Sequence, residues 1–348
     1  MVLRSLLIAS SLLIVISQPS QSSEKKYGAD FMQELTSAEA SGMGEILVAY
    51  SAGARSINNN PAGLAFADGN ELLMNFRRSP HITAIIMKEN EDGKWGDYSK
   101  YNIEPTEMES VNYALPLSRY GNLGLGFVFH HGGRFIRVNQ DGKAINAFPR
   151  DDMVFAAGYG LKILQGVSIG IDVKSIRSKV PVDKGTSFGR TYAMNAGFLH
   201  QIGDRVRVGA VLQNMGNKLS FKAPANDSIP NCLRRRLLLG AMYTSDIRFI
   251  GGRDNTLSLS VDVNPPFENG LRYNFGAELL FLRFLALRVG YIRNTDIYYD
   301  PLLNLSDGSS ANEKRVWIRK GLTIGAGLKF RGAEVNFAKG PRREPILK

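Results

Sequence analysis

The sequence predicts an all-β protein, in which about fourteen antiparallel strands form a transmembrane β-barrel. Three observations predict this fold: segments with an apolar residue at every second position recur along the chain, the links between them alternate between short and long, and a secretory signal precedes them. The 348 residues are 44 % hydrophobic and 22 % charged, which are ordinary values for a folded chain. Disorder is therefore not expected.

The first residues have the pattern of a signal peptide. Arg4 supplies a basic start, residues 6–17 form an apolar stretch, and Ser20 and Ser22 are small residues that suit a cleavage site. A membrane-spanning helix needs about 20 apolar residues, and this stretch is shorter. We therefore expect residues 1–22 to be removed and the mature protein to act outside the cytoplasm.

Charge and cysteine content narrow the functional classes. The chain has 43 Lys and Arg against 32 Asp and Glu, a formal net charge of +11. Such a surplus of positive charge suits binding to nucleic acid, to an anionic membrane surface or to an anionic ligand. Because the protein is expected to act outside the cytoplasm, nucleic acid is not expected as a partner and the other two remain. Cys232 is the only cysteine, so an intramolecular disulfide and a CxxC metal or redox motif are excluded.

The period-two segments begin at residue 71. Residues 166–174 show the pattern clearly, because Val167, Ile169, Ile171 and Val173 alternate with Ser, Gly, Asp and Lys, which gives the strand one apolar face. The predicted strands span residues 71–78, 81–89, 109–117, 123–131, 153–163, 166–177, 190–201, 204–214, 233–250, 254–263, 271–281, 284–293, 319–330 and 333–339. No helix of comparable length fits between them.

The links between these strands alternate in length. Tight links are predicted at residues 79–80, 119–122, 165, 203, 251–253, 283 and 331–332, and longer ones at 90–108, 132–152, 178–189, 215–232 and 294–318. Short turns on one side and long loops on the other are typical of an outer-membrane barrel, which we assign to residues 71–340. The alternative is a soluble two-sheet sandwich, which shares the alternation along each strand.

The segment before the first strand, residues 23–70, lacks this alternation. It contains Gly42-Met43-Gly44, a stretch of small residues, and Asn60-Pro61-Ala62-Gly63 just ahead of strand one. Placed between a signal peptide and about fourteen amphipathic strands, these motifs resemble the N-terminal signature of the FadL-like outer-membrane proteins. That superfamily includes long-chain fatty acid transporters and PorV/PorQ-type proteins. The resemblance implies a fourteen-stranded barrel with residues 23–70 folded inside it as a plug.

The Asn-Pro-Ala-Gly motif has two interpretations. Asn60 precedes a proline and is biased out of the helical region, Pro61 fixes its own φ, and Gly63 lets the backbone pack close to a wall, so the chain turns sharply. Asn60, Pro61, Ala62 and Gly63 are either part of a ligand gate or a turn that leads into the first strand. The ligand gate and the structural turn would use the same four residues, so the motif alone does not choose between them.

The C-terminus departs from the pattern of outer-membrane barrels. The chain ends in Ile346-Leu347-Lys348 without the usual terminal Phe, and the last predicted strand, 333–339, is short. Residues 341–348 are therefore assigned to a tail, and the way in which the last strand closes the barrel stays open.

Three consecutive arginines, Arg234, Arg235 and Arg236, begin the ninth predicted strand after a long link. They are candidates for contact with an anionic head group or with the carboxylate of a fatty acid. The alternative is a solvated junction between loop and strand, where arginine side chains reach toward the membrane interface.

Pro116 lies in the third predicted strand, where it cannot donate a ladder hydrogen bond. In FadL-like transporters a kinked third strand resembles a side exit from lumen to lipid, and Pro116 is the candidate for such an opening here. The alternative is that it merely ends the strand before the turn at 119–122.

The sequence offers no catalytic or metal-binding constellation. His130 and His131 are adjacent on a predicted strand and point to opposite faces, and neither His81 nor His200 has a zinc-like spacing to another ligand. No Gly-x-Ser-x-Gly elbow is present. We expect no enzyme activity, no cofactor and no bound metal.

The resulting hypothesis is passive uptake of a hydrophobic small molecule, a long-chain fatty acid or a related lipid, across the outer membrane of a Gram-negative-type envelope. Glycine and serine on the inner faces would leave space in the lumen, and outer-membrane lipid would surround the barrel. Two alternatives remain: a PorV-like interaction protein that assists export or surface attachment of partner proteins, and a structural porin. Nucleic acid is not an expected partner.

Overall fold

The computed structural model describes residues 28–34, 37–78, 82–89, 95–103, 105–138, 144–182, 185–221, 232–249, 252–265, 271–299, 314–341 and 344–346. The signal peptide expected at residues 1–22 lies outside these ranges. None of the helices in the described ranges has the length and apolar character needed to cross a membrane.

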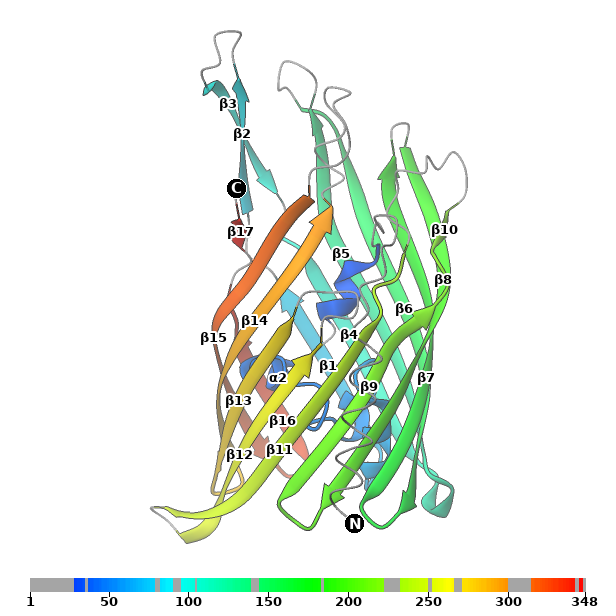
Figure 1. The fold of residues 1–348 in the computed structure, drawn as a ribbon, viewed down its shortest axis with the longest axis vertical. Coiled ribbons are helices and arrows are strands. Elements are labelled where there is room, and N and C mark those ends of the chain that lie inside the picture. The colour runs from blue at the N-terminus through cyan, green and yellow to red at the C-terminus, as the bar shows by residue number, and fades with distance from the viewer. Residues whose placement is uncertain are drawn as a thin grey trace.

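One antiparallel sheet makes up most of the chain. Its main strands are β1 (Glu71–Arg78), β4 (Glu107–Pro116), β5 (Asn122–Val138), β6 (Ala144–Leu164), β7 (Val167–Val182), β8 (Gly185–Ile202), β9 (Val206–Gly216), β11 (Arg236–Phe249), β12 (Gly252–Asn264), β13 (Arg272–Phe281), β14 (Leu285–Tyr299), β15 (Lys314–Phe330) and β16 (Ala333–Lys339). Each pairs with the next in this order. Figure 1 shows that these tilted strands curl around the N-terminal part of the chain.

Several short elements complete the fold. Strand β10 (Ser220–Phe221) pairs with β8, β17 (Glu344–Ile346) pairs with β15, and β2 (Ile82–Glu89) pairs with β3 (Trp95–Ile103) in a separate two-stranded sheet. The helical turns are η1 (Asp30–Glu34), α2 (Ala38–Gly42), η2 (Gly53–Ser56), η3 (Pro61–Phe66) and η4 (Ser118–Tyr120). Part of the predicted tail, residues 344–346, is thus a strand.

The all-β antiparallel fold predicted from the alternation is confirmed, and all of the fourteen predicted strands except the second lie in the main sheet. The second, 81–89, is β2. The pairs Arg78 with Glu107 and Ile82 with Ile103 share one register, so β2 and β3 continue the hairpin of β1 and β4 beyond the main sheet. The turn predicted at residues 79–80 lies outside the described ranges. Alternation identifies a strand but not its partner, which is why the sequence misplaced β2.

The long links on one side are largely extended strands. β5 runs to Val138 and β6 begins at Ala144, while β7 runs to Val182 and β8 begins at Gly185, so the loops predicted at 132–152 and 178–189 are mostly strand. At the opposite end the turns are tight, as predicted, and Gly166, Gly203 and Gly332 adopt positive φ there. The sheet therefore has a short-turn end and a long-hairpin end.

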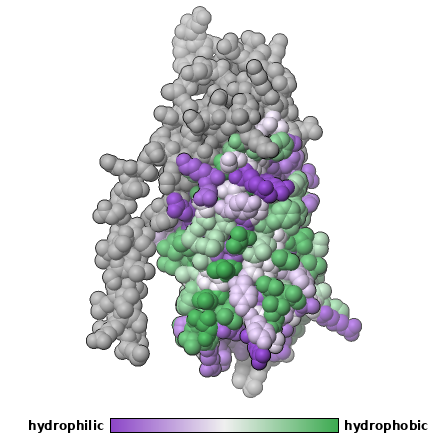
Figure 2. All heavy atoms as spheres, turned by 90° about the vertical axis from the view of Figure 1, so that its right-hand side faces the viewer, coloured by the Kyte–Doolittle hydropathy of each residue, from purple (hydrophilic) through white to green (hydrophobic). Residues whose placement is uncertain are grey.

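The polarity of the two faces of the sheet is the reverse of that in a soluble protein. On β7 the outward Ile169, Ile171 and Val173 are 44 %, 50 % and 50 % exposed, whereas the inward Asp172 and Lys174 are buried. Figure 2 shows apolar side chains gathered in a band on the outer surface, with hydrophilic ones above and below. Apolar side chains face out and polar ones face in, which excludes the soluble sandwich, since a sandwich buries its apolar face.

Candidate functional site

The N-terminal residues 28–67, called here the inner segment, lie inside the curl of the sheet. Helix α2 packs against β14, β15 and β16, η2 packs against β1 and β4, and η3 packs against β5, β6, β7 and β8. Between them, the backbone N–H groups of Leu47 and Val48 donate to Asp262 on β12, at 2.6 and 3.0 Å. The inner segment thus meets strands around the whole sheet.

A belt of glycines on the inner face makes room for the inner segment. Five cross-strand pairs consist of glycine only: Gly124 with Gly158, Gly160 with Gly170, Gly170 with Gly197, Gly209 with Gly240, and Gly276 with Gly290. A Cβ at any of these positions would overlap or crowd another atom, and that atom belongs to the inner segment at almost every one. The inward glycines thus leave space in the lumen, as expected, and the inner segment fills that space.

Polar side chains of the sheet hold the inner segment by its backbone. Asn122 on β5 donates to the carbonyl oxygens of Leu64 and Ala67, at 2.6 and 2.9 Å. Ser168 on β7, Asn195 on β8 and Gln213 on β9 donate in the same way to Ala62, Asn58 and Asn59. These four donors were not predicted from the sequence. Their only signal was a polar residue at an inward position of a strand.

The Asn-Pro-Ala-Gly residues form the start of η3. The Asn60 side chain accepts from the backbone N–H of Ala62 at 3.3 Å and donates to the carbonyl oxygen of Phe198 on β8, also at 3.3 Å. Pro61 takes the first helical position, where its missing N–H costs nothing. Gly63 has no room for a Cβ beside Ser51 and Ser56. The motif therefore caps a buried helical turn and fixes it to the wall.

The three arginines do not act together. Arg234 and Arg236 are buried inside the sheet, whereas Arg235 is exposed. Arg236 donates to Gln213 at 2.6 Å and lines a cavity with Arg272 and Glu45 of the inner segment. A fully solvated junction is thus wrong for Arg234 and Arg236.

Glu45 is the centre of a small charged group. Arg272 of β13 lies 3.8 Å from its carboxylate and Arg77 of β1 lies 3.7 Å from it. Arg272 also donates to Gln33 of the inner segment at 3.3 Å. This part of the lumen is rich in guanidinium groups, which can bind carboxylate or phosphate.

Pro116 is the last residue of β4. It pairs with Asn122, the first residue of β5, and the next backbone N–H, of Leu117, donates to Gly121 at 2.8 Å across the turn. A proline at the final ladder position interrupts no pairing in the middle of the sheet. The structure thus places Pro116 as a strand terminator and not at a side opening in the strand.

The lumen also holds an apolar cluster, called here the apolar chamber. Ala29, Phe31 and Met32 of the inner segment pack there against sheet and link residues Met108, Val128, Val154, Ile176, Ala193, Leu219 and Leu233. Phe31 stacks on His130 of β5, with ring centroids 5.0 Å apart and planes 7° from parallel. Two further apolar clusters, one around Ile46 and Val48 and one around Ile57 and Leu64, also join the inner segment to the wall. The apolar chamber is the cluster that contains residues 29–32 of the inner segment.

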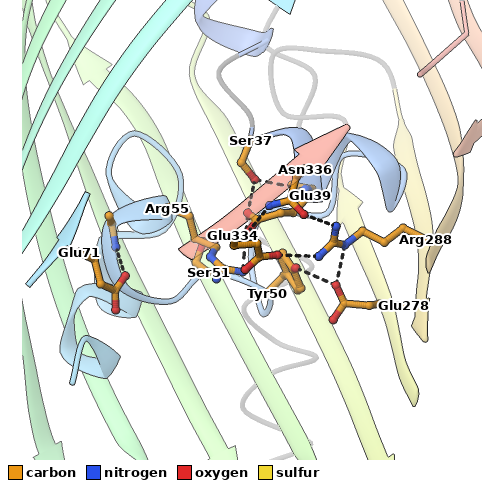
Figure 3. A network of polar contacts seen from close by, with 12 residues as sticks. Ser37, Glu39, Tyr50, Ser51, Arg55, Glu71, Glu278, Arg288, Glu334 and Asn336 are labelled. Carbon is orange, nitrogen blue, oxygen red and sulfur yellow. Dashed lines mark hydrogen bonds and ion pairs between the residues drawn. The ribbon is translucent and has the colours of Figure 1, made fainter. Parts of the chain in front are cut away.

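A polar network ties the other side of the inner segment to the C-terminal strands (Figure 3). Arg288 of β14, fully buried, donates to Glu278 at 2.6 Å, Asn336 at 2.6 Å and Glu334 at 3.1 Å. Asn336 in turn donates to Glu39 of α2 at 3.2 Å. The network therefore joins α2 to β13, β14 and β16.

Tyr50 and Arg55 extend this network within the inner segment. The Tyr50 hydroxyl donates to Glu278 at 3.3 Å, and Arg55 lies 3.8 Å from Glu39. Burial raises the pKa of Tyr50 above its usual value. Burial would lower the pKa of Arg55, but the negative charge of Glu39 and of other neighbours outweighs it and leaves that pKa raised. Tyr50 stays neutral and Arg55 stays charged near neutral pH.

Two cavities in the lumen are too small for a ligand. One lies beside Glu45, Arg236 and Arg272, the other beside Asn58 and Asn112, and each has a volume of about 20 Å³. That is room for about one water, whereas small-molecule sites span about 300–1,000 Å³. Within the described residues, no group of three or more His, Cys, Asp and Glu side chains is arranged to hold a metal.

Known proteins resemble this chain in structure and not in sequence. No protein-family model matches the sequence, and no curated protein matches it. Among solved structures, the toluene transporter TodX of Pseudomonas putida matches with a TM-score of 0.52 and 13 % identity, over 90 % of this chain and 93 % of that one. A FadL homologue of Pseudomonas aeruginosa matches with a TM-score of 0.52 and 12 % identity, over 87 % and 88 %. The chain has a FadL-like barrel fold. The fold implied by residues 42–44 and 60–63 is therefore confirmed.

Proposed function

We propose that this FadL-like barrel spans the outer membrane and admits a hydrophobic small molecule by passive diffusion. The observation that carries the proposal is the apolar chamber, which lies in the lumen between residues 29–32 of the inner segment and the apolar wall residues around Ile176. The fold shared with a protein named as a toluene transporter supports the same class of cargo. Neither a structural porin nor a partner-binding barrel needs an apolar site in its lumen.

The inner segment acts in this proposal as a plug. The glycine belt and the four side-chain donors hold residues 42–67 against the wall, so a straight aqueous pore is closed. Residues 28–34 are attached through the Gly28 N–H, which donates to the carbonyl oxygen of Cys232, through the Arg272 bond to Gln33, and through apolar contacts. A hydrophobic molecule that enters the chamber would displace Phe31 and Met32, which occupy it.

The cargo we propose is a long-chain fatty acid or a related lipid. Gln33 links the chamber residues Phe31 and Met32 to Arg272, and Arg272 shares a cavity with Arg236. Guanidinium groups beside an apolar chamber suit an amphiphile with an acidic head group. We propose no enzymatic role.

The test is uptake into liposomes that contain the purified protein. Ile176, a fully buried wall residue of the chamber, is changed to Asn to make the chamber polar, and Ile176→Leu is the matched control that keeps it apolar. We expect Ile176→Asn to slow entry of labelled palmitate at least severalfold, while Ile176→Leu transports like the unmodified protein. Sucrose should not enter with any variant.

Two outcomes contradict the proposal. If sucrose enters as readily as palmitate, the barrel is a porin. If Ile176→Asn folds, inserts and transports palmitate normally, the chamber is not on the route. Toluene entering in preference to palmitate would keep the hydrophobic-uptake function and overturn the fatty acid assignment.

A further inference from the structure

The outer surface carries like-charged residues that face each other across neighbouring strands. Arg177 of β7 and Arg190 of β8 are directly opposite in the ladder, and both point outward and are exposed. Arg293 of β14 and Lys320 of β15 form a second such pair, also exposed. Like charges directly opposite on one face destabilise a sheet. Two separate pairs of this kind indicate that an anion from outside neutralises them.

All four cations lie at the same level of the barrel. They are eight to twelve residues from the short-turn ends of their strands, which are Val167, Ile202, Leu285 and Phe330. At about 3.3 Å per residue and a tilt of about 40°, ten residues rise about 25 Å, the height of the apolar band of an outer-membrane barrel. The pairs therefore lie just above that band, at the long-hairpin end.

The residues around the first pair fit a membrane interface. Below it on β7, Ile171 and Val173 face outward, and Arg190 lies over the ring of Tyr192, with its guanidinium carbon 5.7 Å from the ring centre. Aromatic side chains are enriched at this depth. Figure 2 shows hydrophilic side chains gathered directly above the apolar band on one side of the barrel.

The neighbouring charges leave the first pair with a positive excess. Lys179, two residues beyond Arg177, lies 3.6 Å from Asp151, and His131 lies 2.7 Å from the same carboxylate. Asp151 is thus engaged by Lys179 and His131. No ion pair links Arg177 or Arg190 to a carboxylate of the described residues. An anion at the interface, where phosphate head groups lie, would complete the site.

We infer that Arg177 with Arg190, and Arg293 with Lys320, bind the phosphate groups of a phosphorylated glycolipid in the outer leaflet. Guanidinium groups match phosphate oxygens in geometry, and a diphosphorylated lipid can neutralise two cations at once. This inference rests on the membrane-spanning role proposed above and concerns the outer wall, not the lumen. The bound lipid would anchor the barrel at a fixed depth.

The test measures which lipid stays with the full-length protein. The purified protein is placed in nanodiscs with lipid A, which carries two phosphates, or with the same glycolipid after phosphate removal, and retained lipid is counted by native mass spectrometry. The variant Arg177→Gln/Arg190→Gln should retain lipid A about thirtyfold less at the first site, given about 1 kcal/mol for each of the two cations at a membrane surface and about 1.4 kcal/mol for a tenfold change. Arg293→Gln/Lys320→Gln tests the second site independently.

Two controls separate charge from folding and position. Arg205→Gln/Arg331→Gln removes the same charge from exposed positions at the short-turn end and should retain lipid A normally. Arg177→Lys/Arg190→Lys keeps the charge and should retain most of it. Equal retention by the Gln variants and the Arg205/Arg331 control, or equal retention of the dephosphorylated lipid, would overturn the inference.

Competition with inorganic phosphate identifies the source of the anion. If phosphate at the same concentration displaces lipid A, the site binds free phosphate and the lipid assignment is wrong; we expect no displacement. The readout involves no transported molecule. Failure of palmitate uptake together with normal lipid retention would therefore contradict the proposed function alone.

Discussion

The side-chain nitrogen of Asn122 lies 2.6 Å from the carbonyl oxygen of Leu64, and through this bond the first residue of β5 holds the end of η3 against the barrel wall. The same nitrogen donates to Ala67 at 2.9 Å, so one side chain serves two buried carbonyl groups.

Replacing Asn122 with Ala should loosen the inner segment. The carbonyl group of Ala67 would lose its donor, at a cost of about 1–3 kcal/mol for a buried polar group that water does not reach. The carbonyl group of Leu64 would keep its bond from the Ala67 N–H, at 3.0 Å. We expect a lower temperature for loss of the heat-modifiable, folded band on gels and a higher ion conductance in planar bilayers. Asn75→Ala is the control, because Asn75 donates only to Ser110, within the wall. Equal effects of the two changes would show that Asn122 has no special role in holding the segment.

Adding a side chain at a glycine of the belt should displace the inner segment directly. A Cβ on Gly170 would overlap the backbone of Pro61 and Ala62. Gly170→Val is therefore expected to give a folded barrel with a marked rise in conductance. Gly69→Val is the control, since no atom lies within 4 Å of a Cβ at that position. An unchanged conductance for Gly170→Val in a correctly inserted barrel would argue against a sealing role for residues 60–63.

Removing the cation of the polar network should be strongly destabilising. Arg288→Met leaves Glu278 without its buried cationic partner, and losing one member of a buried ion pair costs about 3–5 kcal/mol. Glu334 keeps an ion pair with Lys329, at 3.4 Å. The midpoint of unfolding in urea should fall clearly. Glu278→Gln in the same background should recover part of the loss, because it removes the uncompensated charge. Absence of any recovery would mean that Arg288 acts through packing and not through charge.

Tyr50 should make the protein sensitive to alkali. In the unfolded chain a tyrosine ionises near pH 10, whereas burial raises the pKa of Tyr50 in the folded protein. Between these two values the folded state binds the additional proton, so the free energy of unfolding decreases as the pH rises above about 10. In Tyr50→Phe, the temperature of thermal unfolding should decrease less between pH 9 and pH 11 than it does in the unmodified protein. An identical pH dependence in both proteins would contradict this assignment.

The sequence predicted what depends on local periodicity and missed what depends on long-range pairing. Alternation located β13 closely because its outward residues are apolar in an unbroken pattern. β7 continues to Val182, five residues past its predicted end, because polar outward residues such as Arg177 interrupt its apolar pattern. Alternation could not show that β2 pairs with β3, since pairing is decided by the register set at Arg78 and Glu107. It did not distinguish Asn122 or Gln213 from other inward polar residues. Only the folded inner segment gives these two side chains their partners.

The contacts of the inner segment also constrain the order of assembly. Thr323 of β15 accepts from the backbone N–H of Gly44 and donates to the carbonyl oxygen of Gly42, across 279 and 281 positions of the chain. Contacts this distant form late, after the intervening loops have closed. The N-terminal residues must therefore wait for the C-terminal strands before they acquire these partners. Truncation of the last strands during biogenesis would leave the earliest synthesised part of the molecule exposed to proteases and chaperones.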